Sequence, residues 1–327
     1  MKNLLLITIL FFLTAGLVFG QDNYSKISQS DNGHSAEITQ TGASNRVGDP
    51  SNPNEGGVVQ SGSNNAVTIT QSGGSNTVSQ FRLEKGVTNA LVQNGEGNSA
   101  IIQQMDGGQI VGLRTYAYHP GLEQQGNSNH AEIYQSGGSG NHVGELYQHG
   151  TSNEAYIDQS GDGNYANLHQ RGNGESNQSG IMQHGTNNDA GDIAINGSNN
   201  LTGVVQGFGG VLPSKGSDVT MSCNDGGEML LPSDNNYAKQ WINGTYNNAA
   251  ILQGGDGGNH ASQHLPSTYY GTGNYVIITQ YGSGNDATQY IGGNGNVSNV
   301  SQLGVSNNAT VNSVGDNNQS DIYQTNY

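Results

Sequence analysis

The stretch of sequence that decides the fold is residues 60–71, which read Gln-Ser-Gly-Ser-Asn-Asn-Ala-Val-Thr-Ile-Thr-Gln. The same pattern, Q-x-G-x-x-N-x-[AV]-x-[IVL]-x-Q, opens again at Gln93, Gln124, Gln148 and Gln159. It has a period of 11 residues where two copies share a Gln, as residues 148–159 and 159–170 do. A short fixed period is typical of one structural unit stacked on itself. The sequence therefore predicts a repeat fold.

Alternation within each copy predicts one β-strand followed by one turn. Successive side chains of a strand point to opposite faces, so the Asn, the Ala or Val, the Ile or Leu and the closing Gln share one face. The other face carries Thr68 and Thr70 in one copy and Glu154 and Asp158 in another, which marks it as the solvent side. Glycine in the connection permits a chain reversal. We expect an all-β fold, a β-solenoid of strand–turn–strand coils in a cross-β stack of the amyloid type.

A single coil cannot fold alone, because ordering each backbone residue costs about 1–2 kcal/mol and one coil buries few apolar side chains. Buried Asn and Gln are also costly without partners, but stacked copies can bond to one another as amide ladders. The predicted inward amides are Gln60, Asn65, Gln71, Gln93, Asn98, Gln104, Gln124, Asn129, Gln135, Gln148, Asn153, Gln159, Asn164 and Gln170. The predicted inward apolar residues are Val67, Ile69, Ala100, Ile102, Ala131, Ile133, Ala155, Ile157, Ala166 and Leu168. The predicted turn glycines are Gly62, Gly95, Gly126, Gly150 and Gly161.

Weaker copies extend the repeat toward the C-terminus. They begin at Ile195, Ile242, Tyr269 and Ile291, and the last ones run without a break to Gln324. Three stretches break the period, residues 46–57, 105–123 and 207–240. We expect them to be loop insertions between repeats that protrude from the stack, because insertions at turns leave stacked strands intact. The repeat domain is thus expected over residues 21–327.

The first twenty residues have the pattern of a secretory signal peptide. A short positive start at Lys2 precedes the apolar run 4–18, and small residues favour cleavage between Gly20 and Gln21. The formal net charge of the whole chain is −16 at pH 7. Strong negative charge argues against nucleic acid as a partner, because phosphates need Lys and Arg. The sequence predicts an exported protein.

Motifs for catalysis or cofactor binding are weak. Gly161-x-Gly163-x-x-Ala166 matches a dinucleotide-binding pattern by letter, but it lacks the strand–helix context that this pattern needs. His149 and His184 follow repeat Gln residues and are expected to point outward. The single cysteine, Cys223, lies in the 207–240 insertion and excludes an intramolecular disulfide. We expect neither an enzyme nor a bound metal or cofactor.

The spacing is similar to the curlin repeat of curli subunits, which are secreted and form extracellular amyloid fibres on bacterial surfaces. The family pattern S-x5-Q-x-G-x-x-N-x-A-x3-Q corresponds to Gln93, Gly95, Asn98, Ala100 and Gln104, and to Gln148, Gly150, Asn153, Ala155 and Gln159. The resemblance extends from about residue 24 to residue 324. It implies a fibre subunit for cell adhesion and biofilm matrix, either a major subunit or a nucleator. The implied partners are further copies of the chain, a curli nucleator or other curlin subunits, and an outer-membrane secretion pore.

A second class of function is a monomeric β-solenoid adhesin that binds ice or a glycan along a flat face. Ice binding favours regular outward Thr-x-Thr rows, whereas only Thr68-x-Thr70 occurs here. The two ends of the repeat also differ. Asp31 replaces the turn Gly and His34 replaces the Asn in the first copy, whereas the last copies are regular. Such a charge is typical of a blunted edge, so we expect growth at the C-terminal face.

Overall fold

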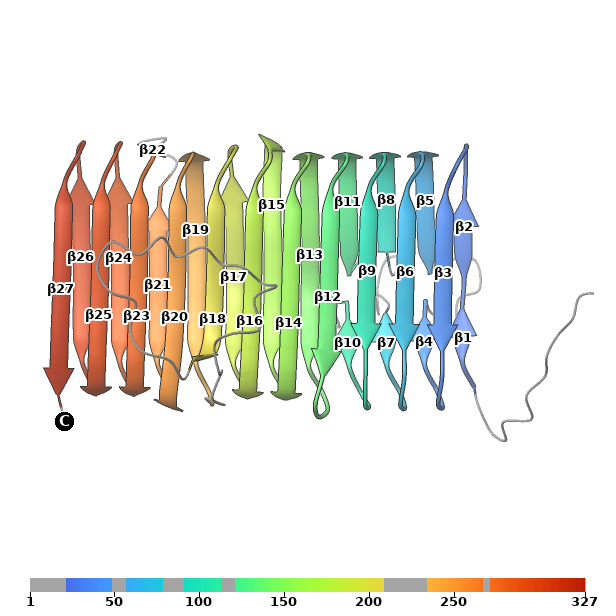
Figure 1. Cartoon of the computed structure of the whole chain (residues 1–327), viewed down its shortest axis with the longest axis horizontal. Helices are drawn as coiled ribbons and strands as arrows, with labels where there is room; N and C mark the ends of the chain where they lie inside the picture. The colour runs from blue at the N-terminus through green and yellow to red at the C-terminus, as the bar shows by residue number, and fades with distance from the viewer. Residues whose placement is uncertain are drawn as a thin grey trace, which may run out of the picture.

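The protein is a β-solenoid whose coils stack along one long axis (Figure 1). The computed structural model describes residues 22–48, 57–78, 91–112, 121–208, 234–266 and 271–326. In these ranges the chain forms strands and turns and contains no helix. The prediction of an all-β solenoid is confirmed. The predicted signal peptide lies outside the described residues, and so do Cys223 and Tyr269.

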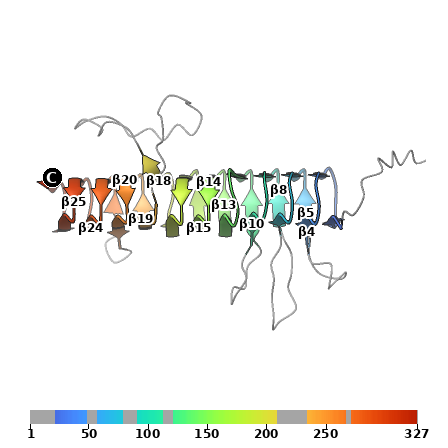
Figure 2. The same ribbon diagram turned by 90° about the horizontal axis from the view of Figure 1, so that it is seen from below.

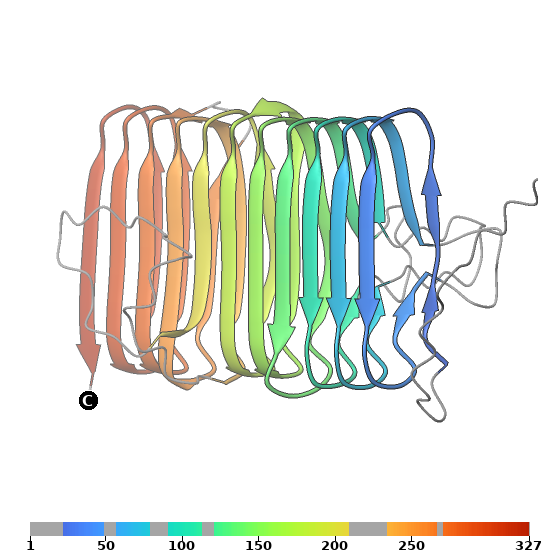
Figure 3. The same cartoon turned by 45° about the vertical axis from the view of Figure 1, so that its right-hand side comes forward.

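Two parallel sheets face each other, as Figures 2 and 3 show. Sheet B has 11 strands, one from each coil. In chain order these are β3 (Ser35–Gln40), β6 (Ala66–Gln71), β9 (Ser99–Gln104), β12 (His130–Ser136), β14 (Glu154–Asp162), β16 (Gln178–Thr186), β18 (Leu201–Phe208), β20 (Asn248–Gly257), β23 (Tyr275–Ser283), β25 (Val297–Val305) and β27 (Gln319–Asn326).

Sheet A has 16 strands. We call the part of sheet A that one coil contributes a level, and several levels consist of two shorter strands. Its strands are β1 (Tyr24–Ser25), β2 (Ile27–Gln29), β4 (Arg46–Val47), β5 (Val58–Ser63), β7 (Thr77–Val78), β8 (Leu91–Glu96), β10 (Ile110–Val111), β11 (Leu122–Asn127), β13 (His142–Thr151), β15 (Tyr165–Glu175), β17 (Asp189–Asn196), β19 (Tyr237–Thr245), β21 (His260–Leu265), β22 (Gly271–Thr272), β24 (Asp286–Gly292) and β26 (Asn308–Val314). Each coil contributes one level to sheet A and then one strand to sheet B.

Equivalent repeat positions are paired in register from coil to coil. In sheet B, for example, Ala131 pairs with Ala155 and Ile133 pairs with Ile157. Because every level is parallel and in register, identical side chains stack on one another. The stacked Ala, Val, Ile and Leu side chains of both sheets form one continuous core.

The turns between the sheets use two left-handed backbone positions. Gly62 has φ +94°, and two residues later Asn64 has φ +55°. A Cβ atom at Gly62 would overlap the carbonyl oxygen of Gly95 in the next coil, so both the backbone angle and the close approach require glycine. The second position carries Asn, Ser or Gly in most coils, which are residues that tolerate positive φ or are small.

Two of the expected insertions differ from the prediction in position. Residues 46–57 contain β4, and residues 105–123 contain β10, which pairs with β7 and β13. These insertions therefore leave from the middle of a sheet A level rather than from a turn. Each interrupted level stays part of sheet A, because the strands on both sides of the insertion pair with neighbouring coils. This is true of β4 and β5 in one level and of β10 and β11 in another. A third break, between β7 and β8, occurs at the same position in the intervening level and is not predicted by the sequence pattern.

The position of these breaks coincides with an irregularity in the next coil. In β13 the register shifts between Val143 and Leu146, where the strand has an extra residue relative to β15. This is a β-bulge, at which ladder pairing is already interrupted. The insertion 207–240 is different, because it joins β18 of sheet B to β19 of sheet A. Residues 207–208 and 237–240 of that range belong to these strands.

Candidate functional site

The interior of sheet B contains an unbroken row of glutamine amides. Ten successive hydrogen bonds join eleven Gln side chains, each from Nε2 of one residue to Oε1 of the next, over 2.8–3.0 Å. The row consists of Gln40, Gln71, Gln104, Gln135, Gln159, Gln183, Gln206, Gln253, Gln280, Gln302 and Gln324. All donate toward the C-terminal end, so the row has a direction.

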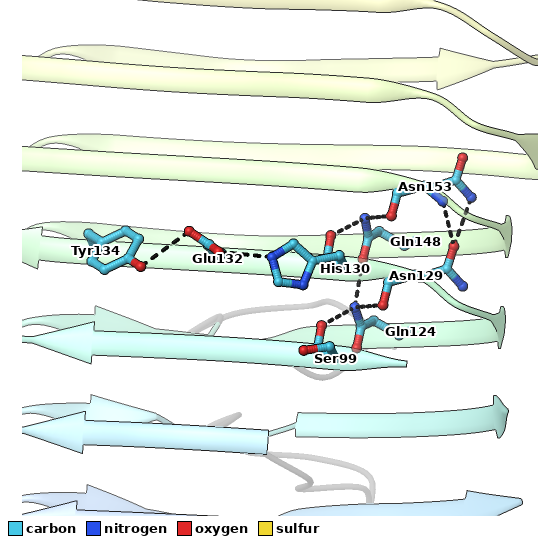
Figure 4. A network of polar contacts seen from close by, with 8 residues as sticks. All are labelled: Ser99, Gln124, Asn129, His130, Glu132, Tyr134, Gln148 and Asn153. Carbon is cyan, nitrogen blue, oxygen red and sulfur yellow. Dashed lines mark hydrogen bonds and ion pairs between the residues drawn. The ribbon is translucent and has the colours of Figure 1, made fainter. Parts of the chain in front are cut away.

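Backbone carbonyls complete the hydrogen bonding of these amides. Figure 4 shows Gln124 of sheet A, whose Nε2 donates to the carbonyls of Ser99 and Asn129 as well as to Gln148 Oε1. The Gln148 amide repeats the arrangement with the carbonyls of His130 and Asn153. A buried amide is costly unless its polar atoms are bonded. Gln at this position therefore links both sheets and two coils at once.

Sheet A has a glutamine row that breaks and changes position. Gln29, Gln60, Gln93, Gln124, Gln148 and Gln170 are joined by five bonds of 2.7–2.9 Å. The next coils place Ile195, Ile242 and Leu265 at that position. A second row, Gln240, Gln263 and Gln289, lies two residues earlier in each strand.

Asparagine side chains form rows at the opposite end of the strands. In sheet B, Asn98 Nδ2 donates to Asn65 Oδ1 and Asn129 Nδ2 donates to Asn98 Oδ1, both at 3.1 Å. The backbone N–H of Asn98 also donates to Asn65 Oδ1, and its Nδ2 reaches the carbonyl of Gly126. The bonds between Asn side chains run toward the N-terminal end, opposite to those of the Gln rows, whereas the bonds to glycine carbonyls run toward the C-terminal end. Each Asn thus fixes the turn of the neighbouring coil.

The structure places the selected amides and apolar residues in one interior and the selected glycines in the turns. The fourteen amides named above have no exposed surface, and the ten apolar residues are at most 3% exposed. The five turn glycines all have positive φ. Sequence reasoning missed Gln240, Gln263 and Gln289. Their signal is Ala-x-Gln-x-Ile or Ala-x-Gln-x-Leu, in which Gln and the large apolar residue have exchanged places.

The two ends of the solenoid carry different residues. At the N-terminal end, His34 occupies the Asn position and its Nδ1 accepts from the backbone N–H of Asn65 at 3.3 Å. Asp31 is exposed, has φ +79°, and accepts a hydrogen bond from Gly62 N. At the C-terminal end, Val311 and Ile322 face the end of the core. Ile322 is only partly buried because no further coil follows within residues 22–326.

The outer face contains small polar clusters. His169 and Glu145 are nearly buried and lie 2.8 Å apart. His184 contacts Ser160 Oγ through Nδ1. Burial lowers the pKa of His184, and the Asp158 carboxylate partly opposes this shift. Among the described residues no group of three or more His, Cys, Asp or Glu is arranged to hold a metal ion. The described ranges also contain no helix long and apolar enough to cross a membrane.

Comparison with known families identifies the repeat. The family model of the curlin associated repeat matches residues 144–172. This range includes most of β13, all of β14 and the first part of β15. Residues 144–172 therefore contain a curlin associated repeat. Comparisons with curated proteins and with solved structures found no match.

Proposed function

We propose that the chain is a secreted structural subunit that stacks end to end into curli-like extracellular fibres for cell adhesion and biofilm matrix. The observation that carries the proposal is the match between the two ends of sheet B. The last coil presents Ile322 and Gln324, and the first coil presents Ile38 and Gln40, in the same strand positions. A following copy would therefore continue both the apolar core and the Gln row.

The chain order at the ends supports the same arrangement. The first coil begins in sheet A with β1 and the last coil ends in sheet B with β27. When a second copy follows the first, the strands therefore keep alternating between sheet A and sheet B across the junction. The outermost strands have unpaired backbone groups along one edge, and such edges template further pairing. A contact that joins one end to the other end of the next copy does not close and gives a filament.

Export and assembly partners complete the proposal. The signal-peptide pattern of residues 1–20 would direct the chain out of the cytoplasm, with Gln21 as the first residue of the mature protein. The curlin repeat favours passage through an outer-membrane pore and assembly with a nucleator or other curlin subunits. We propose a structural role rather than an enzymatic one, because the inward Gln amides bond to one another along the stack. Mass spectrometry of the exported protein checks the cleavage position.

Electron microscopy and sedimentation test fibre formation directly. Purified mature chain at tens of micromolar is expected to convert within hours into unbranched fibres that bind thioflavin T. The same sample should show cross-β reflections, because the strands are perpendicular to the stacking axis. A chain that is folded by circular dichroism and stays monomeric by sedimentation for days would overturn the proposal.

The alternative, a monomeric solenoid that binds ice or a glycan, needs a regular outer row. The outer residues that stack on one another in sheet B instead change from Tyr134 to Asp158, Met182 and Val205. This variation favours a function of the interior and of the ends over recognition of a periodic surface.

A further inference from the structure

The outer face of sheet B carries a second apolar cluster, separate from the core. It consists of Val205, Ala250, Leu252 and Ile277, with Met182 and Tyr275 packed against it, and we call it the outer patch. Its four central residues are only 2–8% exposed although they point away from the core. The outer patch therefore presents little surface to solvent.

The outer patch interrupts a face that is otherwise polar. Val205 pairs with Leu252, and this row continues in the next coils as Thr279 and Ser301. Ala250 pairs with Ile277, and that row continues as Asn299 and Asp321. A contiguous apolar patch on a solvated face is unfavourable unless another group covers it.

A hollow lies directly beside the outer patch. It has a volume of about 290 Å³ and is lined by Tyr156, Gly180, Leu201 and Thr202, among other residues. It forms because Gly180 pairs with Gly203 in the next coil and neither residue has a side chain to fill the face. The hollow adds a depression next to the outer patch, and its lining is mixed, since His130, Glu132 and Glu154 also border it.

We propose that the outer patch is the docking surface for residues 209–233 of the same chain. This segment joins β18 to β19 and begins directly after Phe208, which ends β18 three residues beyond Val205. Its sequence contains Val211-Leu212-Pro213 and Met229-Leu230-Leu231-Pro232. The chain is described again at Asp234, whose Oδ1 accepts from Thr186 N at 2.8 Å.

Pairing of the neighbouring coils excludes this segment from the stack. β18 pairs directly with β20, and β17 pairs directly with β19, so no level is left between these coils. In the proposed arrangement the segment lies outside the two sheets. Its 25 residues can extend over about 80 Å, whereas the outer patch spans four strands spaced about 4.8 Å apart. Length therefore permits docking, and the position of both ends favours this face.

Docking of the segment has a consequence for the sides of a fibre. An uncovered outer patch would recur once in every subunit and offer apolar surface to a neighbouring fibre. A segment of the same chain that covers the outer patch removes this apolar surface from solvent and from neighbouring fibres. We infer that residues 209–233 keep the sides of the solenoid apart, whereas the stacking of coils does not depend on them.

Photo-crosslinking tests which surface the segment contacts. Leu231 is replaced by p-benzoylphenylalanine, and ¹⁴N-labelled and ¹⁵N-labelled chains are mixed before folding. Crosslinked peptides are expected to join residue 231 to the strands β16, β18, β20 or β23 of the same isotopic chain. Crosslinks that join the two isotopes would show that a second copy covers the outer patch. Crosslinks to sheet A, or none to sheet B, would likewise overturn the proposal.

Three further variants separate docking of the segment from folding and from fibre formation. Leu252→Asp in the crosslinking chain should lower the yield several-fold, whereas Thr288→Asp on the outer face of sheet A should leave it unchanged. Replacement of residues 209–233 by Gly-Asn should raise the fluorescence of an apolar dye and bundle the fibres laterally. If the shortened chain keeps its circular dichroism spectrum and shows neither change, residues 209–233 do not cover the patch.

Discussion

Gln240 lies at the point where the glutamine row of sheet A changes position, and one of its polar atoms has no partner. Its Nε2 donates to two carbonyls and to Gln263 Oε1. Its Oε1 is buried without a hydrogen bond among the described residues, because Ile193 occupies that position in the preceding coil. An unsatisfied buried acceptor costs about 1–3 kcal/mol. The start of an amide row is therefore its weakest point.

The first prediction compares two positions in this short row. Gln263→Leu should destabilise the protein more than Gln240→Leu, by about 1–3 kcal/mol. The first change leaves Gln289 Oε1 without its donor and keeps the unpaired oxygen of Gln240. The second change removes one unpaired oxygen while creating another at Gln263. Denaturant midpoints of the two variants measure the difference, and equal midpoints would contradict an energetic role for the row.

The second prediction concerns the pH dependence of stability near His184. Burial lowers the pKa of His184 in the folded protein below its ordinary value of 6.5. The unfolded chain therefore binds a proton at a higher pH than the folded protein does, and stability falls as the pH drops below about 6.5. His184→Asn should reduce this fall between pH 7 and pH 5. A residual dependence is expected from His264, whose pKa burial and Lys239 also lower.

Asp158→Asn is the matched variant for this test. The Asp158 carboxylate raises the pKa of His184 against the effect of burial. Its removal should lower the pKa of His184 further and steepen the loss of stability below pH 6.5. Identical pH profiles of the two variants and the parent chain would show that His184 does not titrate in this range.

Most interior positions could be assigned from the sequence, because the full copies repeat both residue type and spacing. Gln240 could not, because the strict pattern places an apolar residue there. Gln109 is a related case. It takes the Asn position of its coil and leaves Oε1 unbonded among the described residues. Both departures leave the backbone geometry of the repeat unchanged and alter only the hydrogen-bond partners of the inward amides. Periodicity alone therefore does not reveal them.

At the scale of single elements, the turns constrain the sequence more tightly than the strands do. A Cβ atom at Gly126 would overlap the carbonyl oxygen of Gly150 in the next coil. Gly126 also has φ +111°, which L residues with a side chain rarely adopt. The turn glycine is therefore fixed both by its own backbone and by its neighbour along the stack.

The third prediction follows from this double constraint. Gly126→Ala should slow assembly strongly and lower the stability of the product, whereas Gly74→Ala should have a small effect. A Cβ atom at Gly74 would lie 3.6 Å from its nearest neighbour, the carbonyl oxygen of Ala43. Lag times and denaturant midpoints of the two variants measure the contrast. Similar behaviour of both variants would show that the close approach of stacked turns is not maintained.

The insertions show a limit of sequence reasoning about elements. β4, β7 and β10 are two residues long, too short to show a period of two. Each is recognised only by its pairing with the coil above and below. The sequence therefore indicates that residues 46–57 and 105–123 interrupt the period, but it does not show that part of each range belongs to the stack.

At the scale of the whole molecule, the two ends differ in the length of their strands. The C-terminal end has β26 with 7 residues and β27 with 8 residues. At the N-terminal end, the sheet A level consists of β1 with 2 residues and β2 with 3 residues. A longer regular edge offers more backbone groups to an incoming strand. The C-terminal end is therefore the better template.

The fourth prediction is that fibres grow mainly at the C-terminal end. The double variant Val311→Asp and Ile322→Asp should nearly abolish elongation, because both carboxylates would be buried by the next subunit without a partner. Thr310→Asp and Tyr323→Asp provide the control, since these residues are exposed on the same two strands. Seeded elongation rates compare the two. Equal rates would refute growth at this end.

The alternation of the coils between the sheets has a genetic consequence. Stacked glutamines near the C-terminus are 22 residues apart in sequence, which is one level of each sheet. Replication slippage that removes or duplicates a whole coil would change the length of the protein and leave both end surfaces as they are. Loss of a single 11-residue unit would bring two strands of the same sheet together at the junction between subunits. Alleles of this gene should therefore differ in length by an even number of repeats.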